Sequence, residues 1–178
     1  MCIRDRSSLN LEKYDEWKDD KNFINDIMRF LDNVLTDFIE KAPEEFNDAT
    51  YSAMRERSVG LGVMGLRSYF QQKMIPFESV MAKDWNKKIF QHIQEQVDQS
   101  SKDLAEERGP CPDAADYGFN ERFSNKTAVA PTASISIICG GTSPGVEPIA
   151  ANSYTHKTLS GSFNVKNKYL KDLSLIHI

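Results

Sequence analysis

The sequence predicts an α/β fold, on three observations. Amphipathic helical patterns alternate with short apolar segments that suit buried strands. Glycine and proline separate these segments, and the helical patterns dominate the N-terminal half. With 178 residues, of which 40% are hydrophobic and 27% charged, the chain has the size and composition of one globular domain with its own core.

Residues 21–42 are predicted to form the first long helix. Apolar side chains recur there on one helical face: Ile24, Ile27, Met28, Leu31, Val34, Leu35 and Phe38. Asp19 or Asp20 is placed to cap its start, and Pro43 ends it. A polar stretch around residues 47–48 follows, for which no regular element is predicted.

Residues 58–65, apolar and rich in glycine, are predicted to form a buried strand that runs into a short helix. Pro76 separates that helix from a longer one over residues 77–108. The longer helix is expected to bury Phe77, Met81, Trp85, Ile89, Ile93, Val97 and Leu104. Gly109 and Pro110 end it, because glycine adopts the left-handed cap and proline cannot continue a helix.

Residues 125–136 are the most informative segment. A strand over residues 126–130 leads to Pro131, and Thr132, Ser134 and Ser136 follow among small or apolar residues. Small residues let backbone N–H groups approach an anion closely, hydroxyls add donors, and a helix beginning near Ser134 would favour negative charge. A plain turn with a serine or threonine cap gives the same pattern and is commoner, so the pattern alone leaves both interpretations open.

Residues 139–148 combine glycines and prolines that fix an unusual backbone path, as a loop lining a pocket requires. Glu147 is a candidate acid or base, although solvated loop glutamates are far commoner. Cys111, between two prolines, is interpreted as structural, and Cys139 as a small residue packed under the glycine turn.

A G-x-G-x-x-G pattern spans residues 60–65, but a dinucleotide site also needs a hydrophobic strand before it and an acid about twenty positions later. Residues 55–58 are charged or polar and no suitable acid follows, so the glycines are expected instead to let a strand pack closely against its neighbours. His92 is expected on a solvated helix face, and His156 is left without a role.

Charge and composition exclude several classes of function. The net charge of −4 argues against nucleic-acid or membrane-surface binding, which requires a basic face. No apolar run approaches membrane-spanning length. Three cysteines without a C-x-x-C pair make neither a disulfide framework nor a zinc site, so no metal ligands are assigned and a reducing, cytoplasmic setting is the default.

The two ends of the chain differ from the rest. Residues 1–6 and residues 173–178 can be encoded by nucleotide strings that are reverse complements and that resemble a transposase-end sequencing adapter. We therefore expect both segments to be artefacts and residues 7–172 to be native, and Cys2 and His177 are excluded from functional reasoning. Continuous genomic coverage through both junctions would contradict this hypothesis.

Several segments stand in a characteristic order. They are S-L-N-L at residues 8–11, R-E-R-S-V-G-L-G-V-M-G at 55–65, L-A-E-E-R-G-P-C-P at 104–112, N-K-T-A-V-A-P-T-A-S-I-S at 125–136, G-G-T-S-P-G-V-E-P at 140–148 and N-S-Y-T-H-K-T-L-S-G-S-F-N-V-K-N-K-Y-L at 152–170. Together they resemble the large, catalytic subunits of ribonucleotide reductases, class I in particular, over essentially all of the native stretch. The fold that this resemblance implies is the C-terminal part of a ten-stranded α/β barrel.

The resemblance also implies a reaction and a site. The intact enzyme would reduce ribonucleoside diphosphates to 2′-deoxyribonucleoside diphosphates by radical chemistry, for DNA synthesis. The loop matching residues 131–136 would hold the substrate diphosphate, a role carried to Thr132, Ala133, Ser134, Ile135 and Ser136. Ile135 stands where the family often has threonine or serine, so it would contribute its backbone N–H alone.

No catalytic residue is assigned within the chain. The radical cysteine is expected upstream of Ser8, one reducing cysteine about where Arg4 stands, and the tyrosines of radical transfer beyond Asp172. The implied partners are a radical-generating small subunit with its metal-radical cofactor, a second large subunit in a homodimer, and thioredoxin or glutaredoxin as reductant. ATP and deoxynucleotide effectors are implied for the full enzyme, and no cofactor for this part of it.

Two alternatives remain open. A class II reductase would take its radical from adenosylcobalamin and need no small subunit. A non-catalytic phosphate-binding module on a related barrel would lack the upstream N-x-C-x-E segment.

Overall fold

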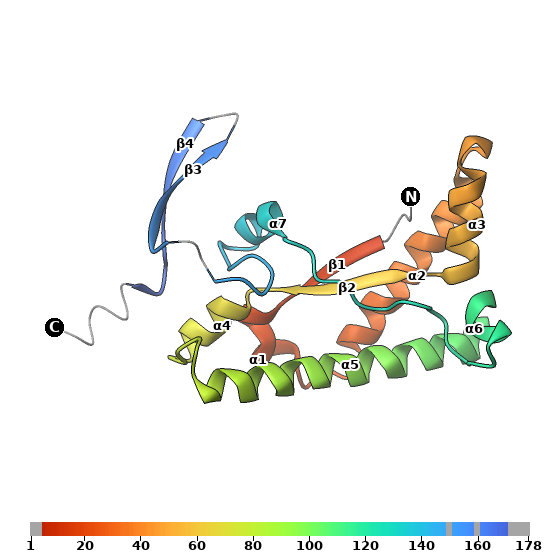
Figure 1. The fold of residues 1–178 in the computed structure, drawn as a ribbon, viewed down its shortest axis with the longest axis horizontal. Helices are drawn as coiled ribbons and strands as arrows, with labels where there is room; N and C mark the ends of the chain where they lie inside the picture. Colours follow the sequence, from red (N-terminus) through yellow and green to blue (C-terminus); the bar gives the residue numbers. More distant parts are fainter. Residues whose placement is uncertain (1–4, 149–150, 159–160, 171–178) are drawn as a thin grey trace.

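The structure is a computed structural model that describes residues 5–148, 151–158 and 161–170. Parallel strands β1 and β2 lie across a layer of helices, with α5 running along the base and a C-terminal hairpin at one end (Figure 1). The elements are β1 (Asp5–Asn10), η1 (Leu11–Lys13), α1 (Tyr14–Trp17), α2 (Phe23–Lys41), η2 (Glu44–Phe46), α3 (Asn47–Glu56), β2 (Val59–Met64), α4 (Leu66–Gln72), α5 (Val80–Arg108), α6 (Pro112–Asp116), α7 (Ala133–Ile138), β3 (Ser153–Thr158) and β4 (Gly161–Lys166).

Of the two terminal segments predicted to be artefacts, residues 1–4 and 173–178 lie outside the described residues. Asp5 and Arg6 are described, as the first two residues of β1, and their backbones pair with Val59 and Gly60 of β2.

Strand β2 is buried at every position: β1 pairs along one edge, residues 125–128 lie along the other, and its valines and leucine belong to the core that the helices form. The backbone N–H groups of Val59 and Leu61 donate to the carbonyls of Asn125 and Lys126 at 2.9 and 3.0 Å. Residues 125–128 thus run beside β2, but the predicted regular strand over residues 126–130 was wrong. The segment makes a single parallel bridge, Leu61 to Thr127, because the ladder of hydrogen bonds ends at Ala128.

The helical layer confirms two sequence predictions and corrects parts of both. Helix α2 buries Ile24, Met28, Leu31 and Leu35, whereas Val34 at its margin is 37% exposed. Helix α5 starts at Val80, because the Ser79 hydroxyl caps it by accepting from the N–H of Ala82 at 3.1 Å. Met81 then falls in the first turn and is exposed, so its predicted burial was wrong. The stripe of Ile89, Ile93, Val97 and Leu104 is buried as predicted.

Helix α3 was not predicted. It occupies the polar stretch after Pro43, and within it only Ala53 is buried, so no apolar stripe marks it in the sequence. The helix ends at Arg57, whose backbone is left-handed with φ of 43°.

A buried carboxylate joins the helices to the strands. Asp32 of α2 is fully buried and accepts hydrogen bonds from three arginines. Arg57 Nη2 lies 2.7 Å from Oδ1, Arg122 Nε 2.9 Å from Oδ1, and Arg108 Nη1 2.8 Å from Oδ2. These arginines stand before β2, in the loop after α6, and at the end of α5, so one side chain ties four parts of the chain together.

Electrostatics keep this carboxyl ionised. Burial alone would raise the pKa of Asp32, but hydrogen bonds and charge from Arg122 and Arg57 outweigh burial and lower the pKa below its ordinary value of 3.8.

Among the described residues, no helix is both long and apolar enough to cross a membrane.

Replacing Asp32 with asparagine should destabilise the intact protein by about 3–5 kcal/mol at neutral pH, because it leaves the buried Arg57 and the largely buried Arg122 without their counter-charge. Urea unfolding followed by circular dichroism measures the loss. Asp37→Asn is the matched control on the same helix, since Asp37 pairs with Lys41 and both side chains are largely exposed; there we expect less than about 1 kcal/mol. Equal effects of the two changes would contradict the role given to Asp32.

At acid pH the wild type and Asp32→Asn should have the same free energy of unfolding. A carboxyl whose pKa is lowered in the folded state stabilises that state above its unfolded pKa, and this stabilisation is lost as pH falls through the folded value. The same unfolding measurements, repeated from pH 7 to below pH 3.8, should show the two stabilities converging. A constant difference over that range would contradict the prediction.

Candidate functional site

The loops that follow the parallel strands gather at one edge of the sheet. Strands β1 and β2 and the segment 125–128 run in the same direction, so their carboxyl ends meet there. Ligand sites of α/β folds with parallel strands lie at this edge. This edge carries η1 after β1 and Gly65 after β2. It also carries the stretch from Pro131 to α7, which follows residues 125–128, the third parallel segment.

Helix α7 presents free backbone donors. Its first hydrogen bond runs from the N–H of Ser136 to the carbonyl of Thr132 at 2.9 Å. Within the described part of the chain, the N–H groups of Ala133, Ser134 and Ile135 donate to no acceptor, and all three residues are exposed. Thr132 enables this turn by adopting a left-handed backbone with φ of 49°. The three donors stand on consecutive residues, as an anion cradle requires.

The three hydroxyls of the loop have different surroundings. Thr132 is buried, and its Oγ1 accepts from the N–H of Gly145 at 2.8 Å. Ser136 is also buried, and its hydroxyl donates to the carbonyl of Ala133 at 3.1 Å. Ser134 is exposed and its hydroxyl makes no hydrogen bond to another described residue. Among the hydroxyls, therefore, Ser134 is the one that faces outward.

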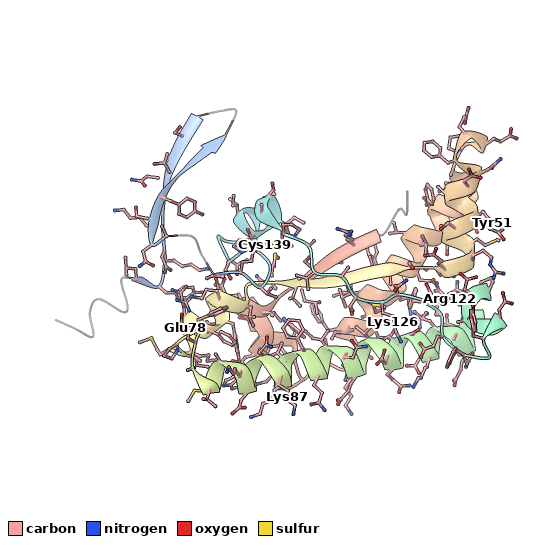
Figure 2. All side chains as sticks on the ribbon, in the orientation of Figure 1. Tyr51, Glu78, Lys87, Arg122, Lys126 and Cys139 are labelled. Carbon is pink, nitrogen blue, oxygen red and sulfur yellow. The ribbon has the colours of Figure 1, made fainter. Side chains whose placement is uncertain are left out.

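The glycine loop of residues 139–147 closes over the strand ends. Gly140, Gly141 and Gly145 have φ of 87°, 68° and 48°, which is the unusual backbone path that the sequence predicts. Cys139 is exposed at the end of α7, so its predicted packing under this turn was wrong (Figure 2). Glu147 is exposed, as expected for a solvated loop glutamate.

Two serines fasten this loop to helix α4. The N–H of Ser68 donates to Oγ of Ser143 at 3.1 Å, and the N–H of Ser143 donates to Oγ of Ser68 at 2.8 Å. The N–H of Gly65 also donates to the Ser143 carbonyl at 2.8 Å. Both serines are fully buried, so these bonds are shielded from water. Sequence reasoning did not find this contact, because neither serine belongs to a pattern that marks its partner.

Gly62 sets the distance between β2 and the third segment. A Cβ atom at this position would lie 2.4 Å from the carbonyl oxygen of Ala128. The predicted role of the strand glycines, close packing, is thus confirmed here. Lys126 extends from the same segment toward α5, where its Nζ pairs with Asp98 at 2.6 Å (Figure 2).

The remaining candidates lie elsewhere. His92 is half-buried and its Nδ1 lies 3.1 Å from the hydroxyl of Tyr14, so it joins the aromatic packing of α1 rather than a solvated face. The backbone of His156 belongs to β3.

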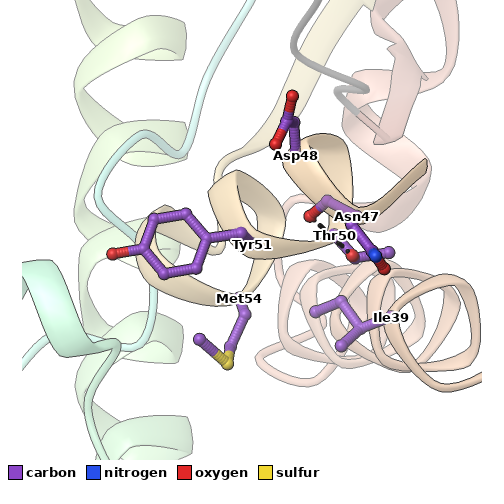
Figure 3. Close-up of a pocket in the computed structure, with 6 residues that line it drawn as sticks. All are labelled: Ile39, Asn47, Asp48, Thr50, Tyr51 and Met54. Atoms are coloured by element: carbon purple, nitrogen blue, oxygen red, sulfur yellow. Dashed lines mark hydrogen bonds between the residues drawn. The ribbon is translucent and has the colours of Figure 1, made fainter. Parts of the chain in front are cut away.

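A shallow hollow on α2 and α3 is lined by Ile39, Asn47, Asp48, Thr50, Tyr51 and Met54 (Figure 3). None of these residues belongs to the loops at the strand ends. No group of three metal-ligating side chains occurs among the described residues.

Parallel strands backed by helices, with loops gathered at the carboxyl ends, define the class as an α/β fold. The family described as "Ribonucleotide reductase, barrel domain" matches residues 6–121 and 113–177. The chain belongs to this family, and its fold is part of that barrel. The family and fold predicted from the motifs are confirmed.

Individual relatives agree. The chain is 53% identical over 164 residues to the ribonucleoside-diphosphate reductase large subunit of Invertebrate iridescent virus 6, covering 92% of this chain and 17% of the relative. It is 36% identical over 132 residues to the vitamin B12-dependent ribonucleoside-diphosphate reductase of Mycobacterium tuberculosis strain H37Rv, covering 72% of this chain and 18% of that protein. The solved class Id ribonucleotide reductase alpha subunit of Actinobacillus ureae matches with a TM-score of 0.84 and 36% identity, covering 97% of this chain and 31% of that one. The chain thus spans less than a third of the length of each.

Gly62→Ala should displace the segment that leads to α7, because the added methyl group overlaps a backbone carbonyl that cannot rotate away. Trypsin cleavage after Lys126 in the native protein should become faster by about tenfold, the equivalent of about 1.4 kcal/mol of lost packing. Gly118→Ala is the control for backbone strain without overlap: its φ of 75° disfavours any side chain, but no atom lies within 4 Å of its added Cβ, so cleavage after Lys126 should change far less. Cleavage at an unchanged rate in Gly62→Ala would contradict this account.

Proposed function

We propose that this chain is part of the catalytic large subunit of a ribonucleoside-diphosphate reductase, which makes 2′-deoxyribonucleoside diphosphates by radical chemistry. Its part in the reaction is to hold the diphosphate of the substrate at the loop of Thr132, Ala133, Ser134, Ile135 and Ser136, in which Ala133, Ser134 and Ile135 present the donors and Thr132 and Ser136 support the turn. One observation carries this proposal: three exposed backbone donors stand side by side at the carboxyl edge of the strands.

The chemistry suits a diphosphate. Backbone amides donate to charged oxygens with hydrogen bonds worth about 1.5–3 kcal/mol each, and they need no side chain to be ordered first. Ala133 and Ile135 contribute N–H groups alone, and Ser134 contributes both its N–H and its exposed hydroxyl. Thr132 and Ser136 support the turn from inside, through Gly145 and through the helix's own carbonyl.

The class I assignment draws on the relatives. The viral large subunit shares more identity with this chain than the vitamin B12-dependent enzyme does, and the solved relative is a class Id subunit. We therefore favour a cytoplasmic homodimer that receives its radical from a small subunit carrying a metal-radical cofactor. Thioredoxin or glutaredoxin would return the reducing equivalents, and ATP and deoxynucleotides would act as effectors elsewhere in the protein.

Ser134→Ala in the full-length large subunit should weaken binding of cytidine diphosphate about tenfold, because it removes the outward-facing hydroxyl donor. Equilibrium dialysis with the labelled nucleotide measures the dissociation constant. Ser136→Ala is the matched control two residues away, and its inward hydroxyl should affect stability more than affinity. Unchanged affinity in Ser134→Ala would count against the phosphate assignment.

The isolated chain should show no reductase activity and should fold poorly. None of the described residues is assigned to the radical step, and β1 has one edge without a strand partner among the described residues. Urea unfolding and a reductase assay with added small subunit test both points. Turnover by the isolated piece, together with cooperative unfolding, would contradict this prediction.

A further inference from the structure

A lysine from the end of the chain links β1 to α7. Lys168 follows the C-terminal hairpin, and its Nζ lies 2.5 Å from Oε1 of Glu12, the second residue of η1. The same ammonium donates to the carbonyl of Gly140, the second residue after α7, at 3.1 Å. The Lys168 ammonium thus connects η1, which follows β1, with the C-terminal end of α7. The free amides lie at the other end of α7, in its first turn.

The Glu12 carboxyl is the centre of a buried polar group. Its side chain is 12% exposed, and its Oε2, the hydroxyl of Thr142 and the hydroxyl of Tyr169 are buried without a well-formed hydrogen bond to any described residue. Burial opposes ionisation, yet Lys168, Tyr169 and Thr142 together lower the pKa of Glu12. Burial and the Glu12 charge raise the pKa of Tyr169. Lys168 Nζ also lies 5.3 Å from the centroid of the Tyr169 ring, so the tyrosine packs beside the ion pair.

Both sides of this contact are anchored. The N–H of Glu12 donates to the side chain of Asn10 at 3.1 Å. On the other side, Asn167 is buried, accepts from the N–H of Tyr169 at 3.1 Å and donates to Asn152 at 3.0 Å. Lys168 and Tyr169 are thus presented from a fixed turn at the base of the hairpin.

We infer that Glu12 and Lys168 form a clamp that positions α7 for the substrate diphosphate. This inference rests on the proposed function. Helix α7 has six residues, and a small rotation of so short a helix re-aims all three of its free N–H groups. Hydrogen bonds weaken steeply when donor and acceptor are misaligned, so fixing the end at Gly140 preserves the geometry at Ser134. Both clamp residues are positioning residues and touch no substrate themselves.

The test uses the full-length large subunit and cytidine diphosphate as the probe. Glu12→Gln and Lys168→Met should each raise the dissociation constant about fivefold, as expected for loss of a partly shielded charge pair. In a reductase assay with the small subunit, KM should rise similarly while kcat stays within about twofold. Lys168→Arg should restore binding to within about twofold, because it keeps the charge and the donors. Glu16→Gln, which breaks the exposed pair with Lys13 at 2.7 Å, should change nothing.

The outcomes separate the two proposals. Weak binding in Ser134→Ala with normal binding in Glu12→Gln and Lys168→Met would overturn the clamp and leave the phosphate loop standing. Normal binding in all three would overturn the proposed function itself. A fall in melting temperature without a change in KM, or failure of Lys168→Arg to restore affinity, would reduce the clamp to a structural contact and overturn the inference.

Discussion

The close contact between β2 and residues 125–128 determines where the candidate loop lies. The backbone of Ala128 occupies space that any side chain at Gly62 would fill, so the third segment can approach β2 at hydrogen-bonding distance. Because this segment is parallel to β2, its end arrives at the same edge as Gly65 and η1. A glycine in a strand thereby places the amides of α7 beside the loops that hold them.

The helical layer is fixed by a different kind of interaction. Asp32 brings three guanidinium groups together around its buried carboxylate: Arg57 and Arg122 lie largely in the interior, where an unpaired charge would be strongly unfavourable, and Arg108 reaches in from the surface. The two inner arginines must therefore keep their partner, and the elements that carry them keep their relative positions. Apolar packing of α2 on α5 alone would tolerate sliding between helices, whereas hydrogen bonds to both carboxylate oxygens specify one arrangement.

How much could be predicted from the sequence depended on whether an element leaves a periodic or local signal. Helices α2 and α5 bury stripes at helical spacing, and β2 is apolar throughout, so these were predicted. Helix α3 buries one alanine and was missed. The family motifs indicated the loop at residues 131–136, but the contacts that support it could not be predicted. Glu12 and Lys168 are 156 positions apart, and Ser68 and Ser143 are 75 apart. Long-range polar contacts of this kind leave no pattern in a single sequence.

Helical geometry explains why the three hydroxyls of the loop divide as they do. Residues four apart lie on the same face of a helix, whereas residues two apart lie on nearly opposite faces. Thr132 and Ser136 are four apart and both are buried, which leaves Ser134 between them on the exposed side. The three hydroxyls are therefore not equivalent as possible ligands. Thr132 and Ser136 stabilise the turn, in which a left-handed residue leads into the short helix α7. The hydroxyl of Ser134 is free to donate beside the backbone amides.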